Sequence, residues 1–151
     1  MTGLNHAATG VLVAVIVKQP ALALPLAFLS HFAVDAVPHF DHKDLLLRPR
    51  LFRTVVGLDA VLTVLLLVIL AGILNIPSWL VIASGLLATL PDLMWLSAIL
   101  RGKIDNPAGE NLLAKINGFH KNIQSWEGSR GAYVEIVWFS VILAFILKIG
   151  R

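Results

Sequence analysis

Long apolar runs separated by short polar stretches dominate the pattern of residues along the chain. A membrane-spanning helix needs about 17 to 25 mostly apolar residues. Five runs approach or reach this length, at residues 4–17, 21–37, 54–74, 79–100 and 132–150. The pattern therefore predicts an all-α integral membrane protein with about five transmembrane helices, in one domain that covers residues 1–151.

The polar stretches between these runs predict how the helices are connected. Residues 41–53 are too charged to span a membrane, and their Leu and Phe residues among Arg indicate a segment lying at the interface. The uncharged turn "NIPS" joins the third and fourth helices into a hairpin. Residues 101–130 are polar, and "ENLLAKINGFHKNI" (110–123) is typical of a short amphipathic surface helix.

Composition supports the membrane prediction and excludes several kinds of site. Hydrophobic residues make up 58% of the chain and charged residues only 14%, with a mean hydropathy of +0.84, far from the values of soluble domains. Because there is no Cys, disulfides and thiolate metal sites are excluded. The net charge of +3 is typical of basic helix ends, so we expect membrane lipid as the surroundings and no nucleic-acid partner.

The distribution of Lys and Arg predicts the orientation. With five spans, the N-terminus and the two polar loops share one side, and those loops contain most of the basic residues. Only Lys18, Lys148 and Arg151 lie on the other side. Because basic loops stay in the cytoplasm, we expect a multi-pass inner-membrane protein with a cytoplasmic N-terminus.

The stretch "SHFAVDAVPHFDH" (30–42) places His31, Asp35 and His39 at i, i+4 and i+8. On one face of a buried helix, these polar side chains are energetically unfavourable unless they bind a ligand or a metal ion. The predicted spans hold further ionisable residues, all near the cytoplasmic ends: His6, Asp59, Asp92 and Glu135. Ionisable groups in such positions usually serve a function or pair with each other.

Imidazole and carboxylate are ligands that zinc uses in hydrolytic sites, and a bound zinc ion activates water. We therefore expect a divalent metal, with zinc favoured over manganese, bound by residues chosen from one set: His6, His31, Asp35, His39 and Asp92. Asp59 or Glu135 would act as general base or support the ligands from behind. The sequence leaves open whether one or two ions bind.

A faint internal repeat supports one shared site. A shift of 53 residues aligns His6 with Asp59, Pro38 with Pro91 and His39 with Asp92. Two repeated helical hairpins followed by a C-terminal helix would then build a site between the hairpins, as repeats of this kind do in transporters.

The motifs resemble those of the inner-membrane-associated metal-dependent hydrolases, a membrane-bound, phospholipase-like family. His6 is followed by Gly10, and the next hairpin ends in "VPHFDH" (37–42), where His39 stands in place of the Asp of the family pattern. "TLPDLMW" (89–95) resembles a degenerate second copy, and "FHKN" (119–122) is a weak match to a late His motif. The resemblance implies a metal-dependent hydrolase acting on a lipid or lipid-phosphate-like substrate.

Other interpretations stay open on the sequence. The chain can be a small ion or proton transporter, although the opposite halves of the spans carry few polar residues. It can also be a non-enzymatic membrane subunit, including one that binds haem between His6 and His31 or His39. Asp41 and His42 can belong to the site or be solvated loop residues, whereas the position of His120 between Phe119 and Lys121 is more typical of a structural residue.

Overall fold

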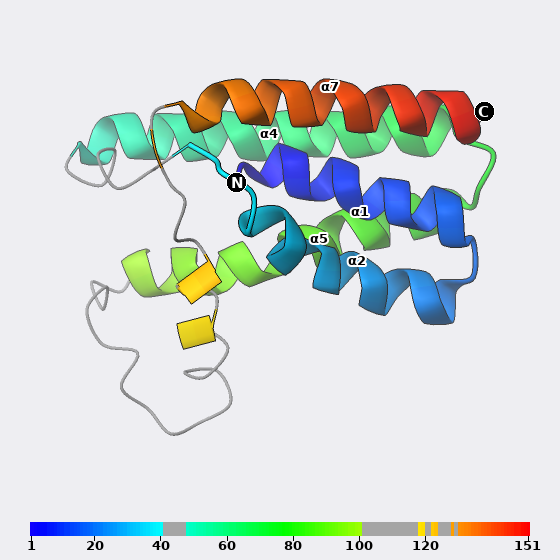
Figure 1. Ribbon diagram of the computed structural model, residues 1–151, viewed down its shortest axis with the longest axis horizontal. Coiled ribbons are helices and arrows are strands. Elements are labelled where there is room, and N and C mark those ends of the chain that lie inside the picture. The colour runs from blue at the N-terminus through cyan, green and yellow to red at the C-terminus, as the bar shows by residue number, and fades with distance from the viewer. Residues whose placement is uncertain (41–47, 101–117, 120–121, 124–127, 129) are drawn as a thin grey trace.

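The described part of the chain contains helices and no β-strand. The computed structural model describes residues 1–40, 48–100, 118–119, 122–123, 128 and 130–151. Its long helices are α1 (Gly3–Val17), α2 (Pro20–Asp35), α4 (Pro49–Ile73), α5 (Ser78–Leu100) and α7 (Gly131–Ile149) (Figure 1). They match the five predicted apolar runs, so the all-α prediction is confirmed.

Proline and local backbone geometry set several helix ends. Lys18 adopts φ 58°, and Pro20 starts α2 at once, so α1 and α2 form a tight hairpin. α2 ends at Asp35, two residues earlier than predicted. Residues 49–53, expected in an interfacial segment, instead begin α4, because Pro49 occupies the first turn of this helix, where its missing N–H costs nothing.

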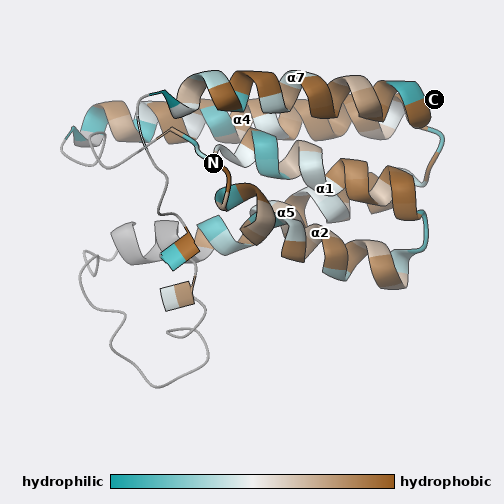
Figure 2. Cartoon of the chain, in the orientation of Figure 1, coloured by the Kyte–Doolittle hydropathy of each residue, from teal (hydrophilic) through white to brown (hydrophobic). Residues whose placement is uncertain are grey.

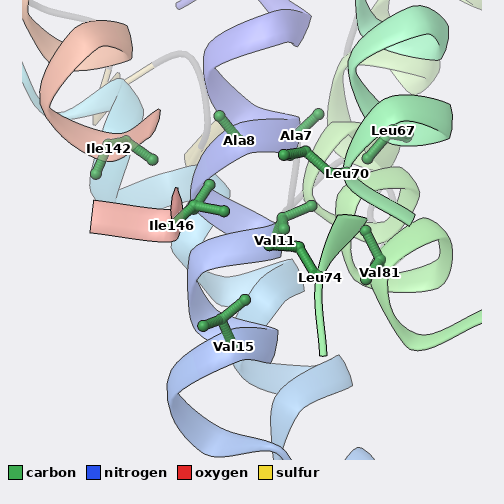
Figure 3. Close-up of a cluster of buried hydrophobic side chains, with 10 residues drawn as sticks. All are labelled: Ala7, Ala8, Val11, Val15, Leu67, Leu70, Leu74, Val81, Ile142 and Ile146. Atoms are coloured by element: carbon green, nitrogen blue, oxygen red, sulfur yellow. The ribbon is translucent and has the colours of Figure 1, made fainter. Parts of the chain in front are cut away.

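The core lies around α1, which contacts α2, α4, α5 and α7. In Figure 3, Ala7, Ala8, Val11 and Val15 of α1 lie among buried aliphatic side chains of the neighbouring helices. These neighbours are Leu67, Leu70 and Leu74 of α4, Val81 of α5, and Ile142 and Ile146 of α7. Helix α1 is therefore the central helix of the bundle.

Helices α1 and α5 lie close together at Gly10. A Cβ atom on Gly10 would lie 2.5 Å from the Ser84 carbonyl oxygen and 2.7 Å from the Ala88 Cβ. Only a residue without a side chain fits this crossing. Gly10 lies one helical turn after His6, so the crossing fixes how closely His6 can approach α5.

Two helices are long and apolar enough to cross a membrane by length and composition. These are Arg50–Ile73 within α4 and Gly131–Ile149, whereas Gly3–Val17, Pro20–Asp35 and Ser78–Leu93 are shorter apolar stretches. Figure 2 shows predominantly hydrophobic residues along α4 and α7. Much of this surface is exposed, with Leu58, Val68 and Ile136 each more than half accessible.

Some predicted features lie outside the described residues. They include residues 41–47 of the charged segment 41–53, the larger part of the predicted surface helix, and three candidate residues: Asp41, His42 and His120.

Candidate metal centre

Four predicted metal ligands meet where α1, α2 and α5 pack together. They are His6 in the first turns of α1, His31 and Asp35 in the last turn of α2, and Asp92 in α5. One ligand atom from each lies within 4.8 Å of the others. We call these residues the group of four. Because α1 and α5 run in opposite directions, an early residue of one meets a late residue of the other.

Asp35 bridges the two imidazoles. Its Oδ1 lies 3.1 Å from His6 Nε2, and its Oδ2 lies 3.2 Å from His31 Nε2. The His31 contact follows from the i, i+4 spacing, which places both side chains on one face of α2. Asp92 also faces both rings, but at 3.7 Å from each Nε2 atom.

A backbone carbonyl of α5 sets the orientation of the His31 ring. His31 Nδ1 lies 2.8 Å from the carbonyl oxygen of Ala88. A carbonyl oxygen only accepts, so we assign the proton to Nδ1. In the neutral ring, Nε2 then carries the lone pair and points toward both carboxylates. Metal-binding histidines commonly have this arrangement, with the second nitrogen donating to a carbonyl.

His6 is fully buried, and its ring stacks on that of His31 at a centroid separation of 4.0 Å and an interplanar angle of 20°. His6 Nε2 lies 3.1 Å from Asp35 Oδ1 but does not meet it with hydrogen-bond geometry, and Nδ1 has no hydrogen-bond partner among the described residues. A buried polar group without a partner is unfavourable. A cation held by Nε2 and the adjacent carboxylates would remove part of this penalty.

Three residues of the group of four are shielded from solvent, and one is partly exposed. The side chains of His6, His31 and Asp35 are fully buried, whereas Asp92 is 36% exposed. The Met1 α-ammonium group, also buried, donates to Asp35 Oδ1 at 2.6 Å. Asp35 is therefore already paired with one positive charge, and a metal ion would share this carboxylate with the Met1 ammonium group.

His39 lies outside the group of four. Because α2 ends at Asp35, the chain turns before Pro38, and the helical spacing that predicted His39 at i+8 no longer holds. The side chain is buried, and its Nδ1 lies 2.8 Å from the carbonyl oxygen of Val37. Its own backbone carbonyl accepts from the N–H of Gly128 at 3.1 Å.

Asp59 and Glu135, expected as general base or ligand support, lie at the N-terminus of α1 and outside the group of four. Asp59 accepts the N–H of Gly3 at 2.8 Å and that of Leu4 at 3.1 Å. Glu135 accepts the N–H of Thr2 at 3.1 Å. Both carboxylates therefore cap the N-terminus of α1, although Asp59 belongs to α4 and Glu135 to α7.

The predicted repeat is only partly reflected in the site. From the pair His6 and Asp59, only His6 joins the group of four, and from the pair His39 and Asp92, only Asp92 joins it. The two hairpins differ because α5 continues through Pro91, whereas α2 has already ended before Pro38.

Sequence reasoning missed several residues that shape the site. Ala88 contributes a backbone carbonyl, which no side-chain motif can reveal. Asn5 donates from its side chain to Glu135 at 3.1 Å. Its position beside His6 is the only sequence signal that could have pointed to it.

No protein-family model, curated protein or solved structure matches the chain. The function is therefore argued from the site itself.

Proposed function

We propose that this chain is an integral membrane protein that binds a divalent metal ion at the group of four and hydrolyses a lipid or lipid-phosphate-like substrate. The observation that carries the proposal is the convergence of two imidazoles and two carboxylates from three helices. The anchored ring of His31, with its lone pair directed at the carboxylates, is the most specific part of that arrangement.

The surfaces of α4 and α7 support the membrane part of the proposal. In the apolar windows of these helices, only 22% and 17% of the residues are buried, so neither resembles the core helix of a soluble protein. Large contiguous apolar surfaces on soluble monomers are rare. Lipid is the simplest environment for them, and α1, α2 and α5 would complete the five predicted spans.

The charged residues support a cytoplasmic orientation for the site. Arg50, Arg53 and Arg130 are exposed near the first turns of α4 and α7, the end at which both carboxylates cap α1. Asp59 lies ten residues after Pro49, which corresponds to about 15 Å along the helix axis. The site would therefore be recessed below a basic surface that faces the cytoplasm.

The donor set favours zinc. Two imidazole nitrogens with carboxylate oxygens, and no thiolate, are common in catalytic zinc sites. Manganese tolerates the same donors, with a stronger preference for oxygen. In this proposal His6, His31 and Asp35, which are fully buried, hold the ion.

Asp92 has a different role in the proposed chemistry. When bound, the ion supplies Lewis acidity and activates water. Asp92 lies farther from the imidazoles than Asp35 does and reaches the exposed side of the site. This carboxylate is therefore placed to accept the proton of the attacking water as the general base.

The exposed residues near Asp92 fit an amphiphilic substrate. Leu90 and Leu93, on either side of Asp92 in α5, are 42% and 53% exposed. An acyl chain can contact such side chains while its polar head reaches Asp92. The arginines at the same end of the bundle would attract a phosphate group.

The stacking of His6 and His31 does not favour haem. Axial ligands approach the iron from opposite faces of the macrocycle. Two nearly parallel rings with centroids 4.0 Å apart leave no space for a macrocycle between them.

The experiment that tests this proposal compares the wild type with Asp92→Asn. Untagged protein in detergent is assayed for metal content and for the hydrolysis of vesicles made of phosphatidylethanolamine and phosphatidylglycerol. We expect Asp92→Asn to retain the metal and lose at least about 100-fold in rate, within the range for general-base catalysis. A wild type that binds metal but forms no lipid product would contradict the hydrolase proposal.

A further inference from the structure

The first turn of α1 is held by side chains from two other helices. The first N–H groups of a helix have no partner within the helix. Here the N–H groups of Thr2, Gly3 and Leu4 all point to carboxylate oxygens of Asp59 or Glu135. Negative charge at a helix N-terminus is favourable, and charge-assisted hydrogen bonds are the stronger ones.

Glu135 connects three parts of the chain. Its Oε2 accepts the N–H of Thr2 and the side-chain amide of Asn5, each at 3.1 Å. Its Oε1 accepts the N–H of Phe40, also at 3.1 Å. Phe40 follows the end of α2, so one carboxylate of α7 joins the start of α1 to the segment that leaves α2.

Asp59 fits closely against the same turn. A Cβ atom on Gly3 would lie 2.8 Å from Asp59 Oδ2, closer than side-chain contacts normally allow. The absence of a side chain at position 3 therefore lets the carboxylate reach the backbone. Both Asp59 oxygens are engaged, one by the Gly3 N–H and one by the Leu4 N–H.

We infer that Asp59 and Glu135 are positioning residues, which set the place of His6 in the metal site by fixing the first turn of α1 from two helices. This inference rests on the proposed metal site. His6 lies within one turn of all three capped N–H groups, so the position of that turn determines how its ring meets Asp35 and His31. The two carboxylates act through the backbone and do not touch the metal.

Other contacts between α1 and α7 keep the bundle assembled without these carboxylates. One turn farther along, Trp138 Nε1 donates to Thr9 Oγ1 at 3.1 Å. Ile142 and Ile146 pack against α1 in the hydrophobic core. Replacing one carboxylate by its amide should therefore leave the fold intact, so that the effect on the site can be measured.

The test is a titration with Co²⁺, which has visible absorption bands that report its ligands. It compares the wild type in detergent with Asp59→Asn and Glu135→Gln. In each variant the amide NH₂ replaces an oxygen that accepts an N–H. We expect the affinity for Co²⁺ to fall by about 10- to 100-fold, as for other residues that orient metal ligands. At saturation, the spectrum should equal that of the wild type because the ligands are unchanged.

Matched controls are Thr54→Ala in α4 and Ser140→Ala in α7, whose exposed hydroxyls each donate to a backbone carbonyl of their own helix. Both should bind Co²⁺ like the wild type. Gly3→Ala tests the contact between Asp59 and the backbone of α1 without changing any carboxylate. Its methyl group would displace the Asp59 side chain. We expect it to weaken Co²⁺ binding as well, with an unchanged spectrum at saturation.

Two results would overturn this inference and leave the proposed metal site standing. One is a Co²⁺ affinity equal to that of the wild type in both amide variants. The other is an altered spectrum at saturation, which would show that the carboxylate is itself a metal ligand. Absence of Co²⁺ binding by the wild type would instead refute the metal site, and the inference with it. Helical content by circular dichroism and a single elution peak establish that each variant is folded.

Discussion

At the scale of the residue, the group of four has an unbalanced charge. Asp35 and Asp92 bring two carboxylates to one point, and His31, with Nδ1 donating to Ala88, presents a lone pair to them. Like charges and lone pairs that face each other in a poorly solvated site are unfavourable. The Met1 ammonium group offsets one negative charge. A cation at the group of four would offset the remaining negative charge and would give the lone pairs on the two Nε2 atoms a partner.

Single residues also mark what the sequence can and cannot predict about the site. His31 and Asp35 were predictable, because their i, i+4 spacing is local. The capping role of Asp59 was not, since its partners lie 56 and 55 positions away in the chain. His39 shared the helical spacing, but α2 ends before reaching it. Spacing within a helix is local information, whereas where a helix ends depends on packing.

At the scale of the element, the crossing of α1 and α5 controls the distance between His6 and Asp92. The Gly10→Ala variant should push the helices apart, because the new methyl group would meet the backbone at Ser84 and the side chain of Ala88. Overpacking of this kind costs about 1 to 3 kcal/mol of stability. We expect both the unfolding free energy and the affinity for Zn²⁺ to fall, as measured by denaturant titration and equilibrium dialysis.

Gly72→Ala in α4 is the matched control, because nothing lies within 4 Å of its added Cβ atom. Alanine is the better helix former, so this variant should be as stable as the wild type or slightly more so. Equal losses in both glycine variants would show that the α1–α5 crossing has no special role.

Helix positions were predictable from hydrophobic runs, as for residues 132–150 and the observed Gly131–Ile149. The start of α4 was missed because the arginines around Pro49 suggested an interfacial segment. These arginines are exposed on a continuous helix. Charge patterns report the environment of a segment, and they do not exclude a helix.

At the scale of the whole molecule, the apolar surfaces of α4 and α7 and the basic end of the bundle define the proposed membrane orientation. The chain contains no Cys, so a single introduced cysteine is the only thiol. Thr54 lies near the start of α4 and Asn75 just after its end, and both are exposed. The two positions therefore report opposite ends of one proposed span.

An impermeant maleimide added to intact cells should label Asn75→Cys and spare Thr54→Cys, because basic flanks stay in the cytoplasm. Inverted membrane vesicles should give the reverse pattern. Labelling of both positions from the same side would contradict the span, and a reversed pattern in cells would contradict the orientation.

The most direct test of the central claim is the metal content of untagged, detergent-purified protein by inductively coupled plasma mass spectrometry, for the wild type beside Asp35→Ala. Asp35 contacts both imidazoles, and Ser140→Ala provides the control on an exposed helix face. The metal site predicts about one equivalent of zinc or manganese in the wild type and the control, and its loss in Asp35→Ala, because structural and catalytic zinc sites depend on their protein ligands. Equal metal content in all three proteins, or none in a folded wild type prepared without chelators, would contradict it.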